Sequence, residues 1–138
     1  MIVENILLIS SLVFFLLTII TDLYCSMFFK RNESKYKELL SEYRRQNLDI
    51  DILTNYAVFF GSIANYQKIM LFVRLYKGKK IKFTKERNIQ KEAYQFIQSL
   101  PAEKIQWILK LDGFFKIQFL VSFLWLLSTG LFFYIIKN

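Results

Sequence analysis

The sequence predicts an all-α membrane protein in which two transmembrane helices, paired as an antiparallel hairpin, bracket a small basic helical cytoplasmic domain. Two observations carry this prediction. The chain has a long apolar run at each end, Ile2–Phe29 and Phe114–Ile136. The 84 residues between these runs hold 17 of the 19 Lys and Arg, so apolar and charged residues are segregated along the chain. We therefore expect a first transmembrane segment at residues 1–29, a cytoplasmic domain at 30–113 and a second transmembrane segment at 114–138.

The first apolar run is long enough to cross a membrane. Its core, Ile6–Ile20, has only hydroxyl side chains as polar members, and its 15 residues cover roughly 22 Å as a helix. Thr21–Phe29 extends that helix through the membrane interface. A cleaved signal peptide has cations before its apolar core, whereas here Glu4 precedes the core and Lys30-Arg31 follow it. We expect an uncleaved anchor with its N-terminus outside.

The second run predicts a full span and, with the charge distribution, an orientation. No charged residue occurs from Phe119 to Ile136, and these 18 residues cover roughly 27 Å as a helix. Cytoplasmic loops carry an excess of Lys and Arg. Residues 30–113 are therefore expected in the cytoplasm, with both termini outside an integral inner (plasma) membrane protein.

Polar side chains within the two runs fall on one face of each predicted helix. In the first helix they are Ser11, Thr18, Asp22 and Cys25. In the second they are Gln118, Ser122, Trp125 and Thr129. Two such faces hide their polar atoms from lipid when they meet. The expected span interface consists of Asp22, Lys116, Gln118, Ser122, Trp125 and Thr129.

Two of these residues leave alternatives open. An ionisable side chain inside a span is a functional hypothesis, so Asp22 either lies solvated or paired with Lys116 at the interface, or belongs to an ion path or partner contact. Tryptophan prefers the membrane interface, where Trp107 is expected. Trp125 lies nearer the bilayer centre and needs a packing surface, which is either the first helix or another subunit.

The middle of the chain predicts three or four short helices, since the whole sequence holds only four Gly and one Pro. The first, Glu33–Leu48, continues the first span into the cytoplasm. It ends in a break at Asn47–Asn55, where Asp49 or Asp51 is available as an N-cap for the next helix.

An amphipathic helix is expected at Tyr56–Tyr76, interrupted near Gly61-Ser62. Its apolar stripe is centred on Ile63, Tyr66, Met70, Val73 and Tyr76, and Phe59, Phe60, Ile69 and Phe72 widen it. This segment either folds into the domain or lies in the membrane interface. Farther along, Thr84 is expected to cap a helix that runs to about Ser99. Pro101 suits the first turn of the next helix, where its missing N–H costs nothing.

The densest positive charge follows the amphipathic helix. Seven cations lie within fifteen residues: Lys77, Lys79, Lys80, Lys82, Lys85, Arg87 and Lys91. Beside a membrane these residues are expected to bind anionic lipid headgroups or an acidic partner, or to form a solvated loop. Nucleic acid is not the expected partner, because no recognition helix or stacking motif accompanies the basic run.

The residues that usually carry catalysis are scarce. The chain has no His, and its one cysteine, Cys25, lies inside the first apolar run. No nucleotide, zinc or nucleophile motif is present. We expect no enzyme activity, no cofactor and no metal site.

In outline, with a short chain, one span at each end and a basic segment between, the protein resembles the bacterial universal stress protein B family. The same outline is similar to small membrane immunity proteins. Both resemblances rest on size and topology alone and imply no role for any residue.

The expected function is that of a non-enzymatic small integral inner-membrane protein that acts through protein–protein contacts, as an accessory or regulatory subunit or as an immunity factor. Its partners would be membrane lipids and another membrane protein or further copies of itself. The alternative is a homo-oligomeric channel or membrane-disrupting effector whose polar span faces line a path. A third possibility is a scaffold tethered to lipid through its basic run.

Overall fold

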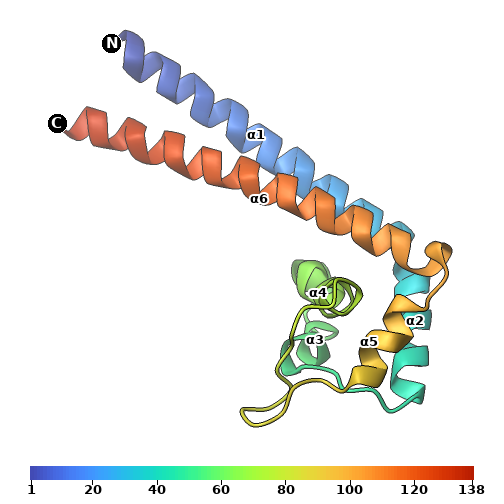
Figure 1. The fold of residues 1–138 in the computed structure, drawn as a ribbon. Helices are drawn as coiled ribbons and strands as arrows, with labels where there is room; N and C mark the ends of the chain where they lie inside the picture. Colours follow the sequence, from blue (N-terminus) through green and yellow to red (C-terminus); the bar gives the residue numbers. More distant parts are fainter. The chain divides into compact units, whose positions relative to one another are not determined.

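The computed structural model describes all residues, 1–138, and its regular elements are all helices (Figure 1). Its elements are α1 (Ile2–Arg31), α2 (Glu33–Arg45), α3 (Ile52–Ala57), the 3₁₀ helix η1 (Gly61–Ala64), α4 (Asn65–Tyr76), α5 (Lys91–Gln98) and α6 (Ala102–Lys137). The chain divides into two compact units. A terminal unit contains Met1–Cys25 and Gly113–Asn138, and a central unit contains Ser26–Asp112. The all-helical prediction is confirmed.

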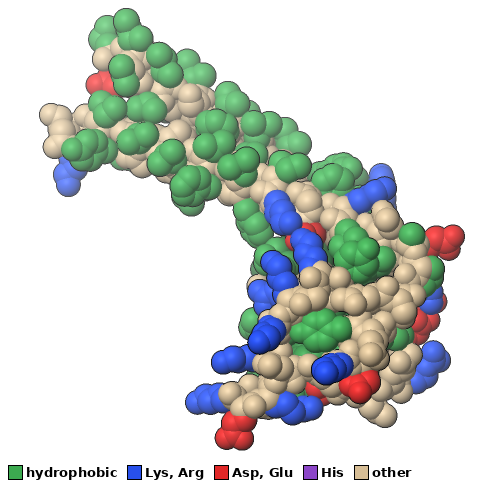
Figure 2. Space-filling model, in the orientation of Figure 1, with side chains coloured by type: hydrophobic (Ala, Val, Ile, Leu, Met, Phe, Trp, Pro, Cys, Tyr) green, Lys and Arg blue, Asp and Glu red, His purple; other side chains and the backbone are tan.

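The terminal unit consists of the apolar parts of α1 and α6, which lie side by side (Figure 1). Both helices are long and apolar enough to cross a membrane. Only 6% of the apolar window of each helix is buried, whereas the core helix of a soluble protein would be mostly buried. Figure 2 shows hydrophobic side chains covering this unit. The prediction of two long apolar helices is confirmed.

The central unit has its own hydrophobic core. The core side chains are Tyr36, Leu39, Leu40 and Tyr43 of α2, Ile69, Phe72, Val73 and Leu75 of α4, Ala93 and Ile97 of α5, Ile105, Ile108 and Leu111 of α6, and Phe29 at the end of α1. They recur at spacings of three and four residues, which places them on one face of each helix. The Phe72 ring lies near the middle of this core and meets Tyr43 edge-on, with centroids 5.6 Å apart.

Local sequence signals determine the breaks between helices as predicted. Asp51 caps α3, its side chain accepting a hydrogen bond from the Thr54 N–H at 3.3 Å. Gly61 has φ +65°, a left-handed conformation that glycine adopts at little cost, and it separates α3 from the helix that follows. Pro101 directly precedes α6, and its carbonyl accepts from the Lys104 N–H at 3.0 Å.

The predicted stripe of the amphipathic helix is correct only in part. Ile63 is 95% exposed and Tyr76 is 39% exposed. Ile69, Phe72 and Val73 of the predicted stripe are buried, and the buried face also includes Asn65 and Lys68. The break at Gly61 starts a new helix at Asn65, and the phase of that helix differs from the phase extrapolated across the break.

Two further expectations are corrected. The helix predicted to begin at Thr84 begins at Lys91. The Thr84 hydroxyl oxygen instead accepts N–H groups from Glu86 and Arg87 and closes a local turn. Trp107, expected at the membrane interface, is buried in the central unit, with its ring 6.1 Å from that of Phe29 and its indole N–H bonded to the Lys104 carbonyl.

Candidate functional site

The polar face of the terminal unit is closed by two hydrogen bonds between α1 and α6. The hydroxyls of Ser11 and Thr129 are 2.6 Å apart. Nearer the central unit in sequence, the Gln118 side-chain amide donates to the Asp22 carboxylate at 2.9 Å. Both bonds join residues that the helical periodicity had placed on facing stripes. In lipid such a bond is worth about 0.6 kcal/mol on average, and it also removes exposed polar atoms.

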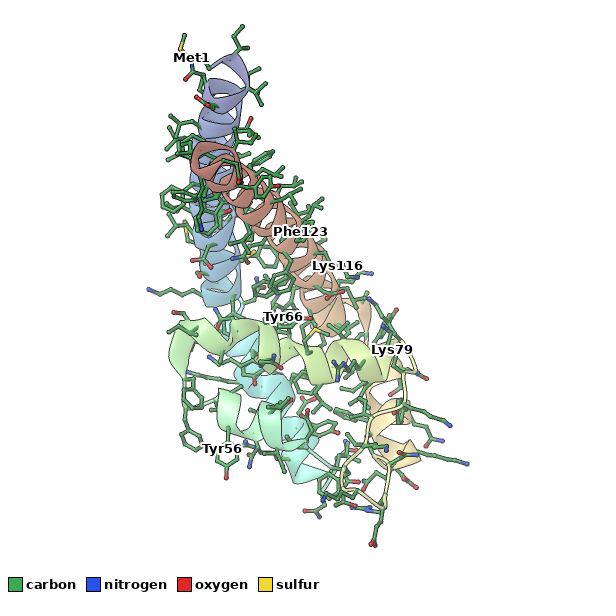
Figure 3. All side chains as sticks on the ribbon, turned by 90° about the vertical axis from the view of Figure 1, so that its left-hand side faces the viewer. Met1, Tyr56, Tyr66, Lys79, Lys116 and Phe123 are labelled. Carbon is green, nitrogen blue, oxygen red and sulfur yellow. The ribbon has the colours of Figure 1, made fainter.

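Trp125 packs within the chain. Its ring lies 5.4 Å from that of Phe15, tilted by 44°. The Tyr24 and Phe114 rings meet edge-on at 5.0 Å in the same unit. A small cavity of about 230 Å³ beside them is lined by Ile20, Thr21, Tyr24, Cys25, Phe114 and Ile117. Of the remaining predicted interface residues, Ser122 is half-buried. Lys116, which Figure 3 labels on α6, is exposed.

The basic run Lys77–Lys91 forms a loop whose ends are fixed to the central unit. The Lys77 ammonium pairs with the buried Asp112 carboxylate at 3.1 Å. Arg87 contacts both oxygens of Asp49 at 3.3 Å, and its guanidinium lies 4.7 Å from the centre of the Phe83 ring. These two cations are therefore engaged in internal contacts.

Further hydrogen bonds hold the loop backbone. The Tyr94 hydroxyl donates to the Lys79 carbonyl at 2.6 Å and accepts from the Ile81 N–H at 3.2 Å. Asp49 also accepts from the Gln90 N–H at 3.3 Å. Five exposed cations of the predicted set remain on this fixed loop, with no ion pair: Lys79, Lys80, Lys82, Lys85 and Lys91.

A groove of about 350 Å³ opens where this loop meets the start of α3. Its lining consists of Asp51, Ile52, Leu53, Arg74, Lys80, Ile81, Lys82 and Phe83. Three cations and one carboxylate line this groove together with apolar side chains. This combination suits an acidic peptide or another anion flanked by apolar groups.

Lys68 is a functional candidate that the sequence analysis missed. Its side chain is buried among apolar residues of α4, with 8% of the residue exposed. The ammonium donates to the Gly61 carbonyl at 2.8 Å and to the Asn65 side-chain oxygen at 3.3 Å. It also lies over the Phe29 ring, 5.1 Å from the centroid. Burial lowers the pKa of Lys68, and the nearby Glu33 carboxylate acts in the opposite direction.

A signal for Lys68 was present in the sequence. It follows Asn65 by three residues and directly precedes Ile69, so it falls on the core face of a helix that starts at Asn65. The predicted stripe, extended across the break at Gly61, did not include Lys68.

A cavity of about 360 Å³ lies beside Lys68 within the central unit. Its lining consists of Ser26, Met27, Phe29, Lys30, Glu33, Gly61, Ser62, Asn65 and Lys68. Two cations, two hydroxyls and an amide converge there with Met27 and Phe29, and the single carboxylate, Glu33, is within 3.7 Å of Lys37.

Large apolar side chains are exposed in the residues that directly precede the cavity-lining Gly61 and Ser62 in the chain. Phe59 is 81% exposed and Phe60 is 66% exposed. Tyr56, 59% exposed, projects from α3 in Figure 3. Soluble surfaces seldom show adjacent apolar groups of this size unless the groups bind something.

No group of three or more His, Cys, Asp or Glu side chains forms a metal site in the structure. Comparison of the chain with protein-family models, with curated proteins and with solved structures finds no match.

Proposed function

We propose that the protein is a non-enzymatic integral membrane protein that recognises an acidic segment of another membrane protein through the fixed loop Lys77–Lys91. In this proposal α1 and α6 form an antiparallel transmembrane hairpin, both termini lie outside, and the central unit lies in the cytoplasm. The protein then acts as an accessory or regulatory subunit, or as an immunity factor that occupies a toxin's membrane segment.

The hairpin is supported by the order of the two interhelical hydrogen bonds. Ser11 precedes Asp22 in α1, whereas its partner Thr129 follows Gln118 in α6. That reversed order is required of two helices that run in opposite directions.

The observation that carries the proposed function is that the basic loop is held in place before any partner binds. Asp49 holds Arg87 and Gln90, Tyr94 holds Lys79 and Ile81, and Asp112 holds Lys77. A loop ordered in advance loses less conformational entropy on binding. The five remaining lysines therefore present a fixed pattern of positive charge, which favours selective recognition of an acidic partner.

The channel alternative has less support. A pore needs a continuous polar lining through the bilayer. In the terminal unit the polar atoms of Ser11 and Thr129, and of Asp22 and Gln118, bond to each other. Trp125 packs on Phe15. The outward surfaces of both helices are apolar, with Leu12, Leu16, Phe119, Phe123 and Leu126 exposed.

The test is a pull-down of the full chain, expressed at its native level and reconstituted in nanodiscs, with mass spectrometry of the intact complex. The loop variant Lys80→Gln/Lys82→Gln/Lys85→Gln is compared with Lys35→Gln/Arg45→Gln/Lys110→Gln, which also removes three exposed cations. At about 0.5 kcal/mol per exposed pair, the loop variant should retain about tenfold less partner.

Equal recovery of the partner by the two triple variants would exclude the loop as the recognition surface. A homo-oligomer without any foreign subunit, accompanied by ion conductance, would instead support the channel.

A further inference from the structure

We propose that the cavity beside Lys68 binds the phosphate of an anionic membrane lipid, and that Phe59, Phe60 and Ile63 enter the bilayer next to it. This inference rests on the proposed membrane location of α1 and α6. It concerns a different surface from the basic loop and a different class of ligand.

The cavity is placed at headgroup level by the continuity of α1. One wall consists of Ser26, Met27, Phe29 and Lys30, which belong to the last turns of that helix. They directly follow the apolar stretch, with no interruption of the helix at Cys25. A helix that leaves the hydrocarbon at about Cys25 carries the next four or five residues through the headgroup region, at about 1.5 Å per residue.

Lys68 supplies a cation that forms no direct ion pair, although the Glu33 carboxylate of the same cavity acts on it electrostatically. Its two hydrogen bonds go to neutral oxygens, the Gly61 carbonyl and the Asn65 amide. An ammonium group has three N–H donors, so one remains for an acceptor in the cavity that Lys68 lines. A buried charge is costly unless it is paired. An anion in the cavity would therefore remove an existing penalty as well as form a new contact.

The other polar groups of the cavity suit a phosphate. Lys30 brings a second cation, and the Ser26 and Ser62 hydroxyls are hydrogen-bond donors. Glu33, the one carboxylate, has Lys37 as a neighbour at 3.7 Å. Met27 and Phe29 form an apolar side of the cavity, which fits the glycerol and first methylenes of a lipid better than it fits a free phosphate ion.

The apolar side chains beside the cavity favour a lipid as the ligand. Gly61 and Ser62 line the cavity, and Phe60 and Ile63 are their immediate neighbours in the chain. Ile63 is 95% exposed and Phe59 is 81% exposed. Apolar side chains that flank a cationic pocket at headgroup level are typical of interfacial anchors, which bury them at the boundary with the acyl chains.

The first experiment measures the depth of Ile63 in the membrane. The full chain, carrying Cys25→Ser and Ile63→Cys, is spin-labelled in nanodiscs, and its accessibility to oxygen and to a water-soluble nickel chelate is compared. A matched label at Glu86→Cys reports on the exposed turn after Thr84. We expect the label at residue 63 to be reached by oxygen and shielded from nickel, and the label at residue 86 to show the reverse. Equal nickel access at both positions would overturn the proposal.

The second experiment identifies the ligand. Native mass spectrometry counts the lipids retained from nanodiscs of phosphatidylcholine alone or mixed with phosphatidylglycerol. We expect phosphatidylglycerol to be retained by the wild type and by the control Lys110→Gln. Loss of one charge-assisted contact, worth about 1.5–3 kcal/mol, predicts at least about tenfold less retention by Lys68→Gln.

Lys30→Gln keeps the proposal testable if Lys68→Gln does not fold, because Lys30 is exposed. Equal retention of the two lipids by the wild type, or unchanged retention by a folded Lys30→Gln variant, would overturn the lipid assignment. Displacement of the bound lipid by millimolar inorganic phosphate would identify a soluble phosphate as the ligand instead.

These outcomes separate the two proposals. Extraction of the wild type from membranes by alkaline carbonate would remove the membrane location on which both depend. If the protein resists extraction but the label at residue 63 is exposed to water, only the proposed lipid site is excluded. The proposed recognition of an acidic partner would then stand.

Discussion

Tyr36 and Tyr43 pack against the same ring, Phe72, yet only one of their hydroxyls has a hydrogen-bond partner. The centroid of Phe72 lies 6.3 Å from Tyr36 and 5.6 Å from Tyr43. The Tyr43 hydroxyl donates to the Asp49 carbonyl. The Tyr36 hydroxyl is buried without a partner. The buried Tyr36 hydroxyl therefore costs free energy of folding, whereas the hydrogen-bonded Tyr43 hydroxyl, seven positions later on α2, does not.

This difference predicts opposite effects from the same substitution. Tyr36→Phe removes an unsatisfied buried hydroxyl and keeps the ring, so it should raise the free energy of unfolding by about 1 kcal/mol. Tyr43→Phe leaves the Asp49 carbonyl without its donor and should lower that free energy by about 1–2 kcal/mol. Urea titration of the full chain in nanodiscs measures both. Destabilisation by Tyr36→Phe would mean that its hydroxyl has a partner.

Burial also predicts a pH dependence. It raises the pKa of Tyr36 to about 12 from 10.0, partly opposed by the nearby Arg44. The folded chain therefore holds a proton that the unfolded chain releases between pH 10 and about 12, and stability should fall as pH rises through this window. The pKa of Tyr43 is raised as well, chiefly by burial.

Absorbance at 295 nm, which reports tyrosinate, measures this effect. Subtracting the titration of Tyr36→Phe from that of the wild type isolates one of the eight tyrosines. A difference curve with its midpoint near pH 10 would contradict the burial of Tyr36.

The Lys77–Asp112 pair provides a further test. Asp112 is 5% exposed, whereas the Lys77 side chain is 36% exposed. Lys77→Met withdraws the cation from a buried carboxylate, and since the lysine is partly solvated we expect a loss of about 1–2 kcal/mol in the free energy of unfolding. Lys79→Met removes an exposed cation from the same loop and should change it by less than about 0.5 kcal/mol. Equal effects of the two substitutions would argue against the pair.

Features determined by neighbouring residues were predictable from the sequence. The apolar runs, the cap at Asp51, the break at Gly61 and the helix start after Pro101 each depend on local chemistry. The facing polar stripes also followed from helical periodicity alone. Helical periodicity grouped Ser11 with Asp22 and Gln118 with Thr129, and the structure adds the hydrogen bonds Ser11–Thr129 and Gln118–Asp22.

Features determined by distant residues were not predictable. Arg87 pairs with Asp49, 38 positions away, and Lys77 pairs with Asp112, 35 positions away, so the sequence analysis treated both cations as available to lipid. Lys68 was missed because its burial depends on the phase of α4, which Gly61 resets. Single-sequence periodicity does not carry across a break of that kind.

The contact between Asp22 and Gln118 yields the last prediction and separates a structural role from an ion path. Gln118 donates its amide N–H to Asp22, while its side-chain oxygen is buried without a partner. Asp22→Leu would leave both polar ends of Gln118 unsatisfied, and we expect a loss of about 1 kcal/mol in the stability of the helix pair, measured by steric trapping in bicelles. Asp22→Asn keeps an oxygen that accepts the same bond, so it should stay within about 0.5 kcal/mol of the wild type. If Asp22 instead served ion passage, its charge would matter more than its hydrogen bond. Asp22→Asn would then abolish conductance as fully as Asp22→Leu while leaving the helix pair intact.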